Sequence, residues 1–196
     1  MDREIRGGIP AEIRADAGGV KVSGYAAVFN QPADIGGWFR EIIHLGAFRS
    51  AIGRDDVPFL INHDGLPLAR TRSGTLILAE DDKGLKMDST LDAADPDVMR
   101  IVPKMQRGDL DKMSFAFRAT RQEWDETGEI PVRHVYECDL FDVSIVTDPA
   151  YSGTEIGLRN LEKHREAARK ATNFHAARNR LRMKLNLALS ERENGR

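Results

Sequence analysis

Two long strand-like segments separated by a short turn constrain the fold of this chain more than any other feature of its sequence. Residues 112–124 and 132–148 are rich in apolar and β-branched residues, as strands are. The run between them, Asp125-Glu126-Thr127-Gly128-Glu129, consists of residues that favour turns. The pattern predicts a long β-hairpin.

The segments before this hairpin also read mostly as strands. Gly46-Ala47-Phe48 opens a short helical turn that runs to Gly53, and a helix is expected to begin at Asp95-Pro96 and to end at Gly108. Pro103 lies inside that helix and should kink or split it. The expected strands cover residues 20–29, 38–45, 57–62, 75–79 and 84–91. The sequence therefore predicts a mainly β fold with peripheral helices, an α+β class.

The character of the chain changes near residue 159. Eight Lys or Arg residues and one acidic residue, Glu166, lie between Lys163 and Lys184. Apolar residues recur there at helical spacing, namely Phe174, Ala177, Leu181, Leu185 and Ala188. We therefore expect an N-terminal extension over 1–19, a main domain over 20–158, and a basic amphipathic helical tail over 159–196.

Composition excludes several classes of protein. The net charge of −2 gives no global attraction to nucleic acid or to membranes. A single cysteine, Cys138, cannot form an internal disulfide framework. No apolar run reaches the roughly 20 residues of a membrane span, and the first residues lack the apolar stretch of a signal peptide. These features predict a soluble cytoplasmic protein.

Familiar motifs for hydrolases, phosphate binding and metal binding are absent, so no cofactor or metal is expected. Two residues remain as candidates for chemistry. His63 lies where an apolar strand meets a turn, a position that suits a general base or a histidine that merely bonds nearby backbone. Ser114 lies in an apolar strand, where its hydroxyl needs a partner. That partner could be a backbone carbonyl, or an imidazole that activates the serine as a nucleophile.

The hairpin suggests a third member. The midpoint between Ser114 and Asp142 is residue 128, inside the expected turn, so the two residues should lie opposite or diagonal on neighbouring strands. A histidine from another segment could then reach both. A register slip would turn Asp142 to the other face of the strand and leave Glu137 and Asp139 as alternatives. His134 shares the face of Asp142 and could serve as the third member in place of an acid. Cys138 is a rival nucleophile, although a single buried cysteine is usually a packing residue.

Seven fragments, in order, resemble the prohead proteases of tailed bacteriophages. They are GYAAVF (24–29), FREII (39–43) leading into GAF (46–48), NHD (62–64), DKGL (82–85), MSFAF (113–117), LFDVSIVT (140–147) and PAY (149–151). Together they span about residues 20–158. Pro103 departs from the family pattern, whose members have an ordinary helix there.

The resemblance implies a serine endopeptidase that trims scaffold and capsid proteins, and itself, inside the immature phage shell in the host cytoplasm. It implies Ser114 as nucleophile, His63 as general base and Asp142 as third member, where many relatives carry Glu. It also implies a fold similar to herpesvirus assemblins, a closed or partly closed β-barrel surrounded by helices. Assemblins use a second histidine as their third member.

The tail is expected to dock on scaffold or capsid protein. The second hypothesis is that it packs against the domain or against a second copy of the chain, and the third is that it binds DNA. The major capsid protein and the scaffold are thus the expected partners, and homo-oligomers are an open alternative. The rival function is a non-catalytic scaffolding protein of the same fold. That rival predicts that Ser114 points away from His63.

Overall fold

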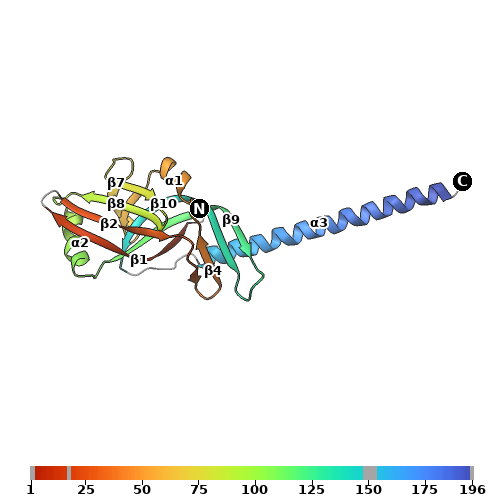
Figure 1. The fold of residues 1–196 in the computed structure, drawn as a ribbon, viewed down its shortest axis with the longest axis horizontal. Helices are drawn as coiled ribbons and strands as arrows, with labels where there is room; N and C mark the ends of the chain where they lie inside the picture. Colours follow the sequence, from red (N-terminus) through yellow and green to blue (C-terminus); the bar gives the residue numbers. More distant parts are fainter. Residues whose placement is uncertain (1–2, 17–18, 148–153, 195–196) are drawn as a thin grey trace. The chain divides into compact units, whose positions relative to one another are not determined.

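A computed structural model describes residues 3–16, 19–147 and 154–194. The strands are β1 (Glu4–Asp16), β2 (Gly19–Val28), β3 (Ala33–Ile35), β4 (Phe39–Ile43), β5 (Pro58–Ile61), β6 (Asp64–Arg70), β7 (Leu76–Glu80), β8 (Gly84–Leu91), β9 (Lys112–Asp125) and β10 (Val132–Val146). The helices are α1 (Arg49–Arg54), α2 (Pro96–Gln106) and α3 (Thr154–Asn194). The main β content with few helices confirms the predicted fold class (Figure 1).

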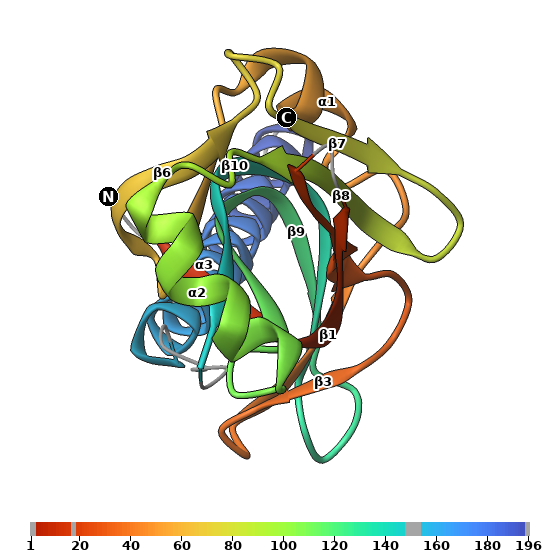
Figure 2. The ribbon, with the colours of Figure 1, turned by 90° about the vertical axis from the view of Figure 1, so that its left-hand side faces the viewer.

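One strongly curved sheet forms the body of the fold (Figure 2). Its strands follow the order β3-β4-β10-β9-β1-β2-β8-β7, and β5 and β6 extend it from β10. The expectation of a closed barrel is wrong, because among the described residues the path ends at β3 and β7 without their pairing. β3 is only three residues long, so its free edge offers few backbone groups for pairing with β7.

The hairpin predicted from the sequence is the pair β9 and β10. Its register pairs Ser114 with Ser144 and Ala116 with Asp142, so Asp142 lies diagonal to Ser114. A bulge between Leu140 and Asp142 shifts the register there. Diagonal neighbours on one face lie within reach of a side chain that spans both.

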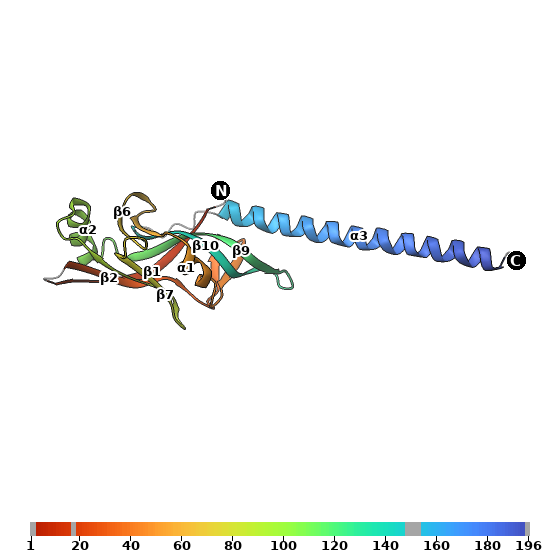
Figure 3. The ribbon, with the colours of Figure 1, turned by 90° about the horizontal axis from the view of Figure 1, so that it is seen from above.

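β1 is the largest addition to the predicted arrangement. Its first half pairs antiparallel with β9 from Glu4 to Pro10, and its second half pairs with β2 from Ala11 to Asp16. β1 and β2 run side by side along the sheet (Figure 3). The segment expected to be an N-terminal extension therefore contributes a strand between β9 and β2.

Helix α2 lies across one end of the curved sheet (Figure 2). Asp95 caps it as expected, since its carboxylate accepts the Asp97 N–H at 2.8 Å. Its buried face consists of Val98, Ile101 and Met105. The helix continues through Pro103, so a split at this proline is wrong, whereas a kink there stays a prediction.

Helix α3 confirms that the C-terminal segment is helical, over 41 residues. The chain divides into two compact units, Met1–Gly157 and Leu158–Arg196, and the boundaries expected from the sequence stay predictions. Phe174, Leu181 and Met183 are exposed on α3. None of the described helices is long and apolar enough to cross a membrane.

Candidate active site

Ser114 lies in the buried first part of β9, where three strands run beside one another. It is fully buried, as are Phe115, Ala116 and Phe117 after it. Ser144 of β10 is opposite it on one side and Gly7 of β1 on the other. Small residues on both sides leave room for a side chain to approach the hydroxyl from the adjoining turn.

His63 occupies that turn, between β5 and β6. Asn62 and His63 both have positive φ, 49° and 61°, which is an uncommon conformation for residues with a Cβ and often marks a functional position. The turn is tied to β10, because the Asn62 amide donates to the Ile145 carbonyl at 3.0 Å and the His63 amide to Ser144 Oγ at 3.2 Å. These bonds hold the imidazole close to the hairpin.

The structure brings the three predicted residues into one hydrogen-bonded chain. His63 Nε2 is 2.7 Å from Ser114 Oγ, and His63 Nδ1 is 2.6 Å from Asp142 Oδ1. Asp142 is 1% exposed, and the His63 side chain is 9% exposed. The arrangement can pass a proton from the hydroxyl to the imidazole, while the carboxylate fixes which ring nitrogen carries hydrogen. The catalytic roles of the three residues stay a prediction.

Ser144 is a member of this site that the sequence analysis missed. Its hydroxyl donates to Asp142 Oδ1 at 2.8 Å while accepting the His63 amide. It therefore fixes the carboxylate relative to the turn that carries the imidazole. The available signal was its place two residues after Asp142 on the same strand, but a serine in an apolar strand has no distinctive pattern.

The N-terminal segment also contacts the site. Arg3 forms an ion pair with Asp142, through the carboxylate oxygen that His63 does not use. The Ser114 hydroxyl is also 2.8 Å from the carbonyl oxygen of Arg6. Both partners suggested for Ser114 by its sequence position, a carbonyl and an imidazole, are thus present.

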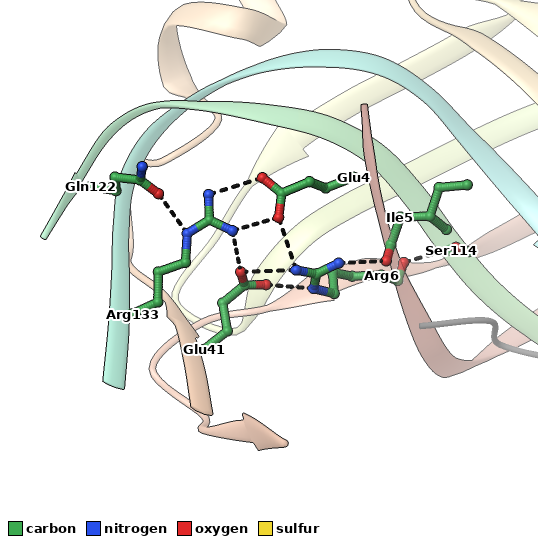
Figure 4. A network of polar contacts seen from close by, with 7 residues as sticks. All are labelled: Glu4, Ile5, Arg6, Glu41, Ser114, Gln122 and Arg133. Atoms are coloured by element: carbon green, nitrogen blue, oxygen red, sulfur yellow. Dashed lines mark hydrogen bonds and ion pairs between the residues drawn. The ribbon is translucent and has the colours of Figure 1, made fainter. Parts of the chain in front are cut away.

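A buried network of four charges anchors this segment (Figure 4). Arg6 Nε bonds Glu41 at 2.7 Å, and Arg133 bonds Glu41 at 2.8 Å and Glu4 at 2.9 Å. Burial raises the pKa of the Glu41 carboxyl, but Arg6 and Arg133 outweigh it and hold that pKa below its ordinary value. Charges so buried need an oppositely charged partner, because an unpaired buried charge is strongly destabilising.

The alternative acids and the alternative histidine have other partners. Glu137 pairs with Arg121, and Asp139 pairs with both Arg54 and Arg118. His134 Nδ1 is 2.9 Å from His44 Nε2, and the two rings stack. The geometry therefore favours Asp142 over these residues as the partner of His63.

The surroundings of Cys138 do not favour its role as a nucleophile. It is buried and its thiol contacts the Ala47 carbonyl oxygen at 3.4 Å. Burial, together with the nearby carboxylates of Asp139, Glu80 and Asp55, raises the pKa of the thiol far above its ordinary value. The unreactive thiol form is thereby favoured. No cluster of metal-binding side chains occurs in the part of the chain that the structure describes.

The pair His44 and His134 gives a prediction about stability. Burial and the neighbouring His134 lower the pKa of His44 below its ordinary 6.5, although Glu123 opposes this. As pH falls below 6.5 the unfolded chain takes up a proton at His44 before the folded chain does, so the free energy of unfolding should decrease. Urea unfolding between pH 7.5 and 5.5 measures this slope.

The matched variants for this pH series are His44→Gln and His164→Gln. His44→Gln should flatten the slope, and His164→Gln, on the exposed part of α3, should leave it as in the wild type. A slope unchanged in His44→Gln would show that another group is responsible.

Comparison with known proteins places the chain among phage proteins. A family model described as Caudovirus prohead serine protease matches residues 10–168. Among solved structures, the chain is similar to the bacteriophage T4 capsid assembly protease gp21 at 10% identity and a TM-score of 0.46, covering 76% of this chain and 100% of that one. No curated protein matches significantly.

Proposed function

We propose that this chain, which belongs to the caudovirus prohead serine protease family, is a serine endopeptidase that cleaves scaffold and capsid precursor proteins, and itself, during prohead maturation. It would act inside the immature capsid in the host cytoplasm. The observation that carries the proposal is the continuous chain of hydrogen bonds from Ser114 through His63 to Asp142.

The proposed reaction follows from the roles these groups can take. His63 Nε2 accepts the Ser114 proton as Oγ bonds to the carbonyl carbon of the substrate. The same proton then goes to the leaving amine as the peptide bond breaks, which leaves an acyl group on Ser114. A water molecule, deprotonated by His63, hydrolyses that ester and restores the hydroxyl. Asp142 accepts the Nδ1–H throughout and stabilises the imidazolium.

The rival reading, a scaffolding protein without activity, differs in one measurable respect. A protease shortens the capsid precursor and creates new N-termini, which mass spectrometry of the mixed proteins detects. Prior treatment of the chain with diisopropyl fluorophosphate should stop this cleavage, whereas EDTA should not affect it. A precursor that remains intact in mature particles would support the scaffold reading, and inhibition by EDTA alone would indicate a metal-dependent hydrolase.

The capsid precursor and the scaffold are the proposed partners, and α3 is the proposed docking element. This part of the proposal is supported by the exposed apolar side chains of Leu181 and Met183 beside a row of basic residues. An amphipathic helix of this kind can place its apolar side chains in a groove of a partner protein.

A further inference from the structure

We propose that the β9 edge beside Ser114 is the binding site for an extended substrate segment, and that residues 4–10 occupy this site as an autoinhibitory cover strand. The inference rests on the proposed protease function.

The cover strand lies directly on the nucleophile. Gly7 is the residue of β1 that pairs with Ser114. A Cβ added at Gly7 would lie 2.7 Å from Ser114 Cβ and 2.9 Å from Ser114 Oγ, closer than real contacts allow. The glycine backbone thus lies against Ser114, which is 0% exposed, and a scissile carbonyl that approaches Oγ from this side would have to displace it.

The cover strand also opposes proton transfer within the site. The Arg6 carbonyl oxygen is an acceptor for the single proton of the Ser114 hydroxyl, in competition with His63 Nε2. This carbonyl is bound unproductively, since it presents its oxygen to the nucleophile, whereas a scissile carbonyl must present its carbon. Arg3 neutralises Asp142, which weakens the stabilisation of an imidazolium at His63.

The cover strand is built to detach without opening the rest of the sheet. Among the described residues, 4–10 pair with β9, whereas the following residues 11–16 pair with β2. Gly7 and Gly8 lie inside the cover strand, where the ladder with β9 is already interrupted by a register shift between Gly7 and Ile9 and where Gly8 has a φ of 115°. A groove of about 400 Å³ runs along residues 6–9 and leaves room for movement.

The buried charge network works as a latch. Glu4 and Arg6 belong to the cover strand, while their partners Glu41 and Arg133 belong to β4 and β10. Glu41 and Arg133 also bond each other, so they remain paired when the cover strand leaves. Glu4 and Arg6 would pass into water, where charges are well solvated. The attraction within a buried ion pair is largely offset by the desolvation of its two charges. Release of Glu4 and Arg6 into water therefore lowers the stability of the fold only a little.

Detachment would leave the backbone groups of residues 112–117 unpaired along one edge of β9. An extended peptide binds such an edge by adding a strand to the sheet. The cover strand shows the geometry that this occupant must match: antiparallel to β9, with backbone crossing directly over Ser114. A folded surface or a helix could not satisfy that edge, so the occupant is an extended segment of the protein to be cleaved.

The test uses the full chain and a fluorophosphonate reporter that labels an activated serine. Gly7→Ala should displace the cover strand by the clash with Ser114 and increase the labelling rate at least tenfold. Gly53→Ala is the matched control, because a Cβ at Gly53 in α1 meets nothing within 4 Å. Its labelling rate should equal that of the wild type. Arg3→Gln, which removes the ion pair with Asp142, should give a smaller increase.

A synthetic peptide separates strand binding from general loosening of the fold. A peptide of residues 2–11 added to Gly7→Ala should slow labelling again, and the same peptide carrying Gly7→Val should not. Equal labelling of Ser114 in the wild type and Gly7→Ala, or no inhibition by the peptide, would overturn the cover strand while leaving the protease proposal intact. Failure of Ser114 to label in every folded variant would contradict the protease proposal and the inference with it.

Discussion

Replacing Ser114 with alanine is expected to lower turnover of the capsid precursor by about 10⁶-fold, the scale seen when a triad nucleophile is removed. The reason is that His63 Nε2 then has no hydroxyl to deprotonate, although substrate binding along β9 is unaffected. Cleavage followed by mass spectrometry gives the rate. The comparison is repeated in the Gly7→Ala background, where the proposed cover strand no longer limits the reaction.

Ser89→Ala is the matched control for this change. Ser89 is also a buried serine in a strand, and its hydroxyl donates to the Thr75 carbonyl at 2.8 Å, away from His63. Each variant should lose about 1 kcal/mol of stability from the missing hydrogen bond. Ser89→Ala should keep its activity. Cleavage by Ser114→Ala within tenfold of the wild-type rate would refute Ser114 as the nucleophile.

The parts of the fold that were predictable from sequence are those with a strong local signal. The turn at 125–129 and the apolar strands beside it predicted the β9–β10 hairpin, and Asp95-Pro96 predicted the start of α2. In both cases residues close in sequence determine the structure, through turn chemistry and helix capping.

The first half of β1 was missed because its buried residues are charged. Glu4 and Arg6 have the composition of a solvated segment, and their burial depends on Glu41 and Arg133 from distant strands. No local pattern can reveal a charge that is compensated by residues far away in sequence. The same limit hid the contact of this segment with Ser114.

The sequence left two registers of the hairpin open and could not choose between them. A centre at residue 128 suggested that Asp142 lies opposite or diagonal to Ser114, and the structure selects the diagonal, with Ser144 opposite. Bulges between Val135 and Cys138 and between Leu140 and Asp142 shift the register along the ladder, and their positions were not predicted from the sequence. Asp142 still reaches His63 because the imidazole spans the diagonal between the two strands.

Replacing Asp142 with asparagine is expected to lower turnover by about 10⁴-fold with little loss of substrate binding. The amide of the new side chain would present an N–H to His63 Nδ1, so the imidazole would carry its hydrogen on Nε2. That nitrogen could then no longer accept the Ser114 proton. The change also removes the partner of Arg3, which should loosen the cover strand and increase the rate. Turnover therefore falls only if the loss of rate from the changed His63 tautomer is larger than the gain of rate from the loosened cover strand.

Asp139→Asn is the matched control, on the same strand but paired with Arg54 and Arg118 at the surface. It should leave turnover within about twofold, because exposed ion pairs contribute little. Nitrogen NMR of labelled histidine separates the two roles open to Asp142. If Asp142 sets the tautomer, the hydrogen on His63 should move from Nδ1 to Nε2 in Asp142→Asn and stay in place in Asp139→Asn. A loss of turnover with the tautomer unchanged would mean that Asp142 acts on the fold around His63, and that another group orients the base.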